Sequence, residues 1–196
     1  MSDLFISVDV QTSGPIPGDY SLLSLGMSVC GYDLDPDKNF YIEIRPLSGS
    51  KHDQSYLESA RFDWKKINED GWGFDPKEAM SQSLKWVRRV SGPDKPVLVS
   101  WNGFYDHMFI TWYFTHFLGT NPFGTGQGRS IDLKSLLIGR TGIEYGDVSE
   151  RSLAKIGITN TYKHTGNALE EAKLQGDFFQ KLSEYNKLRV QSLTRT

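Results

Sequence analysis

The order of secondary-structure patterns along the chain predicts an α/β fold in which helices flank a mixed five-stranded sheet. Three strand-like segments come first and are joined by short polar turns, which predicts an antiparallel meander. Two further short strands then alternate with helices, as parallel strands joined by crossovers do. The 196 residues fit one domain, residues 1–196, because the sequence has no internal repeat, low-complexity tract or linker.

Alternation with a period of two identifies the first strand, residues 4–11. It separates two faces, one with Leu4, Ile6, Val8 and Val10, the other with Phe5, Ser7, Asp9 and Gln11. The next two strands are predicted for residues 24–32 and 39–46. Short apolar runs predict the last two strands at residues 96–101 and 130–133.

Helical spacing predicts short helices at residues 53–61 and 64–70 and a longer one at 76–90. Asp75 is the expected N-cap of the longer helix, with Pro76 at its first position and Glu78 in its first turn. The segment 105–118 is apolar almost all round, which predicts a deeply buried helix. A helical turn is expected at 135–139, a short helix at 148–156 and a long final helix from residue 168 to about 190.

Charge and cysteine content narrow the possible classes of protein. The formal net charge of −2 argues against a protein that coats nucleic acid through a general basic surface. Cys30 is the only cysteine, so the chain has no internal disulfide and no multi-cysteine zinc site. We expect a cytoplasmic protein, because the N-terminus lacks a signal-peptide pattern and no apolar run approaches a membrane span. The oligomeric state is left open.

Three separate segments each direct one carboxylate toward the interior. Asp9 lies on the same strand face as Gln11, although a polar residue near a strand end is an equally ordinary interpretation. Asp106 shares a helix face with Ile110, Tyr113 and Phe117; an acid in a first turn can also simply complement the helix dipole.

The adjacent residues Glu170 and Glu171 are predicted to face opposite ways. Glu170 completes a capping-box-like pair with Asn167, so it is expected on the solvated side of the helix. Glu171 shares its face with Leu174, Phe178 and Leu182 and is expected to point inward. Because an unpaired buried carboxylate is unfavourable, a divalent metal ion, Mg²⁺ or Mn²⁺, is an economical explanation for three inward acids.

Three short runs resemble the exonuclease motifs of the DEDD, or DnaQ-like, superfamily of 3′–5′ exonucleases. They are VDVQTSG at residues 8–14, SWNGFYD at 100–106 and GNALEEA at 166–172. Their order and spacing cover most of the chain. The resemblance implies an RNase H-like fold and two metal ions, one activating a water and the other stabilising the leaving 3′ oxygen. It assigns catalytic and metal-binding roles to Asp9, Gln11, Asp106 and Glu171.

This sequence departs from the pattern of the superfamily at three positions. Gln11 stands where the superfamily has Glu, Glu171 where it has Asp, and Gly166 where one branch has a His that acts as general base. His164, two residues earlier, is the candidate substitute base, and a surface histidine is the ordinary alternative. The loss of one charge and of a general base predicts an impaired or Mn²⁺-dependent nuclease. A Glu-to-Gln change introduced to trap substrate would leave the same residue at position 11.

The resemblance also suggests contacts with single-stranded nucleic acid or a 3′ overhang. Ser13 and Gly14 are expected beside the scissile phosphate, and Asn102 is a candidate hydrogen-bonding residue. Leu22, Phe104 and Tyr105 are candidates for stacking on the terminal bases, with core packing as the alternative for each. The scattered positive charges of the C-terminal half, which include Lys134, are explained by ordinary solvated surface. DNA and RNA are not distinguished.

Two other functions remain open on the sequence. Gln11, Gly166 and Glu171 are also compatible with a non-catalytic nuclease-fold module that binds nucleic acid or a protein partner. A structural or dimerisation domain using exposed aromatic residues around Trp64, Trp72 and Phe74 is the third possibility, although such residues more often pack in a core.

Overall fold

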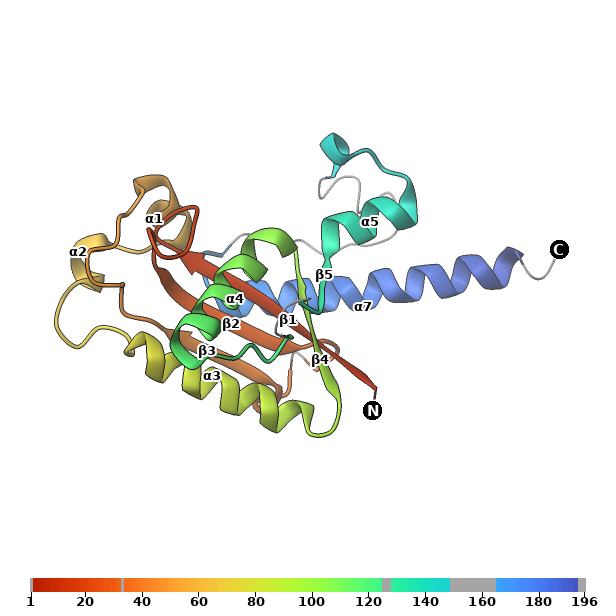
Figure 1. Ribbon diagram of the computed structural model, residues 1–196. Helices are drawn as coiled ribbons and strands as arrows, with labels where there is room; N and C mark the ends of the chain where they lie inside the picture. Colours follow the sequence, from red (N-terminus) through yellow and green to blue (C-terminus); the bar gives the residue numbers. More distant parts are fainter. Residues whose placement is uncertain (1, 33, 125–127, 149–164, 194–196) are drawn as a thin grey trace.

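The computed structural model describes residues 2–32, 34–124, 128–148 and 165–193. A five-stranded sheet of order β3-β2-β1-β4-β5 forms its centre (Figure 1). The strands are β1 (Asp3–Thr12), β2 (Leu22–Val29), β3 (Asn39–Glu43), β4 (Lys95–Ser100) and β5 (Ser130–Asp132). The first three are antiparallel, and β4 and β5 run parallel to β1. This confirms the predicted meander followed by parallel strands.

Helices cover both faces of the sheet (Figure 1). The helices are α1 (Gln54–Ala60), α2 (Trp64–Ile67), α3 (Pro76–Ser91), α4 (Gly103–Leu118), α5 (Leu133–Thr141) and α7 (Ala168–Leu193), with two 3₁₀ turns, η1 (Pro36–Lys38) and η2 (Tyr145–Asp147). Most of the helix predicted for residues 148–156 lies outside the described part of the chain.

The alternation of β1 directs its side chains into two of the three hydrophobic clusters formed by the described residues. Ile6, Val8 and Val10 pack with residues of α3 and α4 in the larger cluster. Phe5, on the opposite face of β1, packs beside Phe178 and Phe179 of α7 in the second cluster. Since Asp9 shares the parity of Phe5, it lies on the face that α7 covers.

Local capping explains why several helices begin where they do. Asp75 accepts hydrogen bonds from the backbone N–H groups of Lys77 and Glu78, as the sequence predicts. Asp132 caps α5 through the N–H of Ser135, at 2.7 Å, and α5 extends over nine residues rather than the one turn predicted. The other Asp132 oxygen accepts the N–H of Gly103 at 2.8 Å. This bond holds the start of α4 at the end of β5, two residues earlier than predicted.

A glycine allows the start of α7 to approach the sheet closely. Gly26 of β2 pairs with Asp9 of β1. A Cβ atom at Gly26 would lie 2.2 Å from the backbone carbonyl group of Ala168, the first residue of α7. Only glycine therefore permits this packing, which brings the first turns of α7 beside Asp9.

Candidate active site

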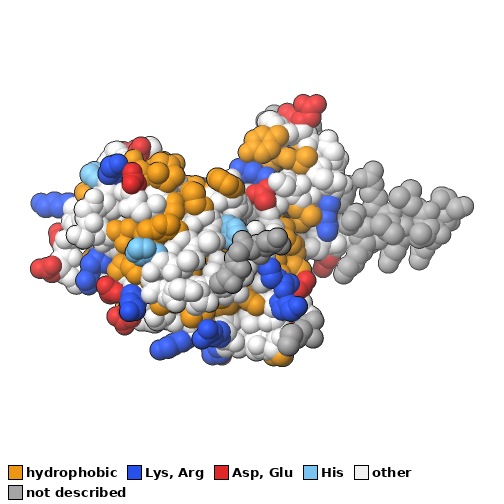
Figure 2. Space-filling model, in the orientation of Figure 1, with side chains coloured by type: hydrophobic (Ala, Val, Ile, Leu, Met, Phe, Trp, Pro, Cys, Tyr) orange, Lys and Arg blue, Asp and Glu red, His pale blue; other side chains and the backbone are white. Residues whose placement is uncertain are grey.

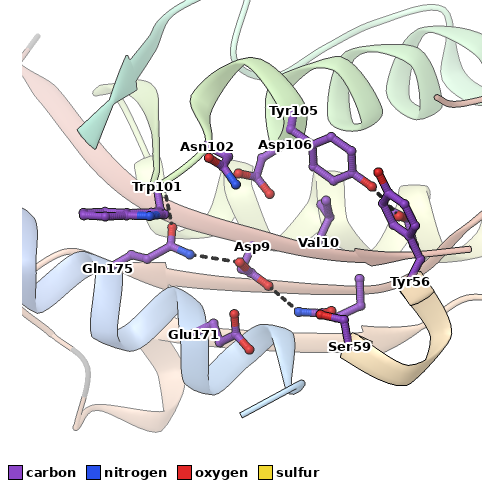
Figure 3. Close-up of a pocket in the computed structure, with 12 residues that line it drawn as sticks. Asp9, Val10, Tyr56, Ser59, Trp101, Asn102, Tyr105, Asp106, Glu171 and Gln175 are labelled. Atoms are coloured by element: carbon purple, nitrogen blue, oxygen red, sulfur yellow. Dashed lines mark hydrogen bonds between the residues drawn. The ribbon is translucent and has the colours of Figure 1, made fainter. Parts of the chain in front are cut away.

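A cavity of about 320 Å³ opens where the ends of β1 and β4 meet the first turns of α4 and α7 (Figure 3). Side chains from four different parts of the chain surround it. The lining residues are Asp9, Val10, Gln11, Thr12, Tyr56, Ser59, Trp101, Asn102, Tyr105, Asp106, Glu171 and Gln175. The four residues predicted to bind metal, Asp9, Gln11, Asp106 and Glu171, all belong to this set.

Asp9 lies at the centre of the cavity, where its carboxylate points between Asp106 and Glu171 (Figure 3). Each of its oxygens accepts an amide hydrogen bond of 2.9 Å, Oδ1 from Gln175 and Oδ2 from Gln11. Burial, and then the charges of Asp106 and Glu171, raise the pKa of Asp9 well above its ordinary value, while the two amide bonds act in the opposite direction.

Asp106 is buried in the first turn of α4, with the apolar residues Ile110 and Tyr113 on the same face. Burial raises the pKa of its carboxyl group from an ordinary 3.8 to about 7. The inward orientation expected from helical spacing is confirmed. A simple role in complementing the helix dipole would not need such burial.

The turn before α7 holds the Glu171 carboxylate. Its Oε1 accepts the backbone N–H groups of Thr165, at 3.1 Å, and Gly166, at 2.8 Å. Asn167 caps the helix through the N–H groups of Leu169 and Glu170. Glu171 is 2% exposed, whereas the Glu170 side chain is 57% exposed and lies 3.6 Å from the Lys173 ammonium group. The predicted contrast between the two adjacent glutamates is confirmed.

The donor set of the cavity suits a hard divalent cation. Three buried carboxylates supply oxygen donors, and the carbonyl oxygen of Gln11 can add a neutral one. Within the described ranges, however, no three acidic, histidine or cysteine side chains lie close enough together to form a ready-made metal-ligand group. The three carboxylates therefore line one cavity without forming such a group among the described residues.

The predicted substrate residues divide into two groups. Asn102 and Tyr105 line the cavity. The Tyr105 hydroxyl donates to the Gly14 carbonyl, at 3.0 Å, and also hydrogen bonds with the Thr12 hydroxyl. Phe104, which is 86% exposed, lies outside this cavity and borders an adjacent apolar hollow of about 600 Å³. It is therefore available for stacking.

Ser13, Gly14 and Leu22 do not line the cavity. The Ser13 hydroxyl donates to the Lys51 carbonyl and accepts the N–H of Ser21, so it organises the loop after β1. Leu22 has no exposed surface and packs in the larger core cluster, where it cannot meet a base. For Leu22, core packing replaces the stacking role, because the pairing of Thr12 with Leu22 starts β2 two residues earlier than predicted.

The structure describes position 166, where one branch of the superfamily has the general base, but not the candidate substitute, His164. Gly166 has a φ of +70°, and a Cβ atom there would lie 2.9 Å from the Ser59 carbonyl oxygen. The backbone at position 166 thus favours glycine and leaves little room for a larger side chain.

Several residues that line or border the cavity were not identified from the sequence. Tyr56 and Ser59 come from α1, and the Tyr56 ring stacks with that of Tyr105 at a centroid distance of 6.4 Å. Their spacing of three residues puts them on one helix face, which was the available signal. Lys134 lies at the rim: its ammonium group donates to Asn102 Oδ1 at 2.7 Å and lies 5.6 Å from the Trp101 ring centroid.

The visible surface carries no extended basic patch. On the face shown in Figure 2, Lys and Arg side chains are scattered among acidic ones, and hydrophobic side chains form several patches. This distribution agrees with the net charge of −2. No helix in the described part of the chain is long and apolar enough to cross a membrane.

Comparison with curated proteins identifies a relative that matches almost the whole chain. The chain is 36% identical over 190 residues to the 3′–5′ DNA exonuclease Cap18 of Escherichia coli, covering 95% of this chain and 96% of that protein. No family model matches the chain.

Solved structures share the fold at low sequence identity. The nuclease domain of 3′hExo, a DEDDh family member bound to rAMP, matches with a TM-score of 0.70 at 10% identity, over 93% of this chain and 92% of that chain. Escherichia coli exonuclease I in complex with a dT13 oligonucleotide has a TM-score of 0.70 at 11% identity, over 98% of this chain and 43% of that chain. The chain thus spans less than half of exonuclease I.

These similarities agree with the three motifs in the sequence and with the observed sheet order. The chain belongs to the family of the 3′–5′ exonuclease Cap18, within the DnaQ-like superfamily, and has the RNase H-like fold.

Proposed function

We propose that residues 1–196 form one domain that acts as a metal-dependent 3′–5′ exonuclease on DNA single strands and 3′ overhangs. The observation that carries the proposal is the meeting of three buried carboxylates, from β1, α4 and α7, around one cavity. The relative named a 3′–5′ DNA exonuclease supports DNA as the substrate. We also propose a cytoplasmic location, which the absence of a disulfide at the single cysteine, Cys30, supports.

Asp9, Asp106 and Glu171 would hold Mg²⁺ or Mn²⁺, with the carbonyl oxygen of Gln11 as a neutral additional donor. When bound, the metal ions supply an activated water and stabilise the leaving 3′ oxygen. Metal binding also requires the carboxylates to draw closer together, because they do not form a ready-made ligand group within the described residues.

The rim residues suit the end of a polynucleotide. Lys134 and Asn102 form a polar pair that can contact a phosphate, and Tyr105 presents a ring beside the carboxylates. Phe104, the most exposed of these aromatic side chains, can stack on a base. The Asn102 side chain does not cap α4, and its Oδ1 instead accepts the Lys134 ammonium group.

We further propose that the site is atypical and slow. Gln11 removes one charge from the ligand set, and the backbone at Gly166 supplies no proton-transferring group where one branch of the superfamily has His. These features also favour the second candidate, a non-catalytic module that binds DNA ends. Metal-dependent cleavage distinguishes the two.

The test is single-turnover digestion of an oligonucleotide duplex with a labelled 3′ overhang, in Mn²⁺ and in Mg²⁺. Glu171→Gln is compared with Glu170→Gln, the adjacent residue on the solvated side of the same helix. We expect Glu171→Gln to lose at least about 10²-fold in rate and Glu170→Gln to cleave like the unchanged protein. Equal rates in all three proteins would refute the site, and overhang binding without cleavage would favour the non-catalytic module.

A further inference from the structure

We propose that Gln175 is a positioning residue that orients Asp9 for metal binding, by linking its carboxylate to the backbone where β4 ends. The inference rests on the proposed function. It concerns a residue that belongs to none of the three motifs in the sequence. Gln175 lies one helical turn after Glu171 on α7, and it is 1% exposed.

Both ends of the Gln175 amide are hydrogen bonded (Figure 3). Its Nε2 donates to Asp9 Oδ1 at 2.9 Å. Its Oε1 accepts the backbone N–H of Trp101, also at 2.9 Å. The Trp101 N–H can only donate, so Oε1 must face Trp101 and Nε2 must face Asp9, and the amide has one satisfactory orientation. A buried amide that is hydrogen bonded at both ends in this way restrains the two groups that it joins.

These two bonds connect α7 and β1 with the short link between β4 and α4. Gln175 and Glu171 are on α7, and Asp9 is on β1. Trp101 is the first residue after β4, five residues before Asp106. The Trp101 ring also packs edge-on against Phe178 of α7, with centroids 5.4 Å apart at an interplanar angle of 81°. The two hydrogen bonds of Gln175 therefore place Asp9 relative to α7, which carries Glu171, and relative to the chain segment that leads into α4 and Asp106.

Gln11 cannot do this in place of Gln175. It donates to the other oxygen of Asp9, but it lies two residues away on the same strand. Its bond can turn the Asp9 carboxylate without relating it to α4 or α7. Two amides on the two oxygens leave little rotational freedom, and a metal ion would meet an Asp9 carboxylate that is already oriented.

The test compares Gln175→Met, which keeps the length of the side chain and removes both bonds, with Gln180→Leu. Gln180 is half-buried on the same helix, outside the cavity, where its amide lies near Gly31. Mn²⁺ affinity is measured by titration calorimetry without DNA, and kcat and KM are measured on the 3′-overhang oligonucleotide. We expect Gln175→Met to weaken Mn²⁺ binding about 10–100-fold and to lower kcat with KM unchanged, while Gln180→Leu changes neither.

A measurement on the unchanged protein keeps the inference testable if Gln175→Met does not fold. The side-chain NH₂ resonances of Gln175 should shift on addition of Mg²⁺, and those of Gln180 should not. If the unchanged protein binds no metal, the proposed function fails. If it binds Mn²⁺ and cleaves but Gln175→Met does both equally well, or if the Gln175 resonances do not respond, only the role of Gln175 is refuted.

Discussion

The backbone N–H of Gly166 donates to Oε1 of Glu171 across 2.8 Å, so the turn that precedes α7 holds a carboxylate that α7 carries. The superfamily pattern has Asp at this position, and the longer Glu side chain can fold back to reach the turn. Gly166 adopts a φ of +70° to present its N–H. The two departures from the superfamily pattern, Gly166 and Glu171, are thus joined by this hydrogen bond.

Replacing Gly166 with Ala is expected to destabilise the protein and to weaken Mn²⁺ binding. The positive φ costs an L-residue roughly 1–2 kcal/mol, and the new Cβ would also lie 2.9 Å from the Ser59 carbonyl oxygen. Gly142→Ala is the matched control, because Gly142 has a φ of +71° and nothing within 4 Å. Thermal denaturation with and without Mn²⁺ measures both effects; an equal loss in the two variants, with metal binding intact, would contradict this account.

Replacing Gly26 with Ala is expected to displace the first turn of α7. The added methyl group would lie 2.2 Å from the backbone of Ala168, and such overpacking costs about 1–3 kcal/mol of unfolding free energy. Because Glu171 and Gln175 move with that turn, cleavage should fall along with stability. Gly139→Ala, at an exposed position of α5 with nothing within 4 Å, should instead stabilise by about 0.5–1 kcal/mol. Chemical denaturation of both variants measures the two changes in unfolding free energy, and an unchanged stability of Gly26→Ala would contradict this account.

Changing Gln11 to Glu is expected to make the metal-free protein less stable and the metal-bound protein more active. A carboxylate at position 11 would replace the amide that donates to Asp9 at 2.9 Å, so two like charges would meet in a buried cavity. A divalent cation reverses this repulsion. The melting temperature in EDTA, the rise caused by Mn²⁺ and the single-turnover rate are measured together.

The matched control for Gln11→Glu is Gln54→Glu, which adds the same charge at an exposed position on α1 outside the cavity. It should alter neither the Mn²⁺ response nor the rate. An unchanged or slower rate in Gln11→Glu would show that position 11 does not limit catalysis.

The metal-free protein is expected to lose stability as the pH rises from about 4 to about 7. The pKa of Asp106 is about 7 in the folded protein against an ordinary 3.8, and the pKa of Asp9 is also raised. Between these values the folded state binds more protons than the unfolded state, so raising the pH favours unfolding. We expect Asp106→Asn to flatten this dependence. Melting temperatures in EDTA from pH 4 to pH 8 provide the measurement, and parallel profiles for the two proteins would contradict it.

Mn²⁺ should reverse the trend, because it binds the ionised carboxylates. Its stabilising effect is expected to grow as the pH rises through 7. The same titration repeated with millimolar Mn²⁺ tests this, with Glu170→Gln as a control whose response should match that of the unchanged protein. A Mn²⁺ effect independent of pH would place the metal elsewhere.

Local periodicity was enough to predict the direction of the three acids. The alternation of β1 put Asp9 opposite the apolar face, and helical spacing turned Asp106 and Glu171 inward and Glu170 outward. Each of these statements concerns a side chain relative to its own element, which the spacing of neighbouring residues decides. The three motifs added the order of the elements and hence the fold.

Contacts between residues far apart in the sequence could be identified only from the tertiary structure. No local pattern relates Gln175 to Asp9, 166 residues apart, or brings Tyr56 of α1 to Tyr105 of α4. Leu22 was misassigned for the same reason, since pairing with Thr12 extends β2 into the core. Such contacts depend on crossovers and on close approaches, such as that of Ala168 to Gly26, whose geometry is set by packing between layers rather than by residue spacing along one of them.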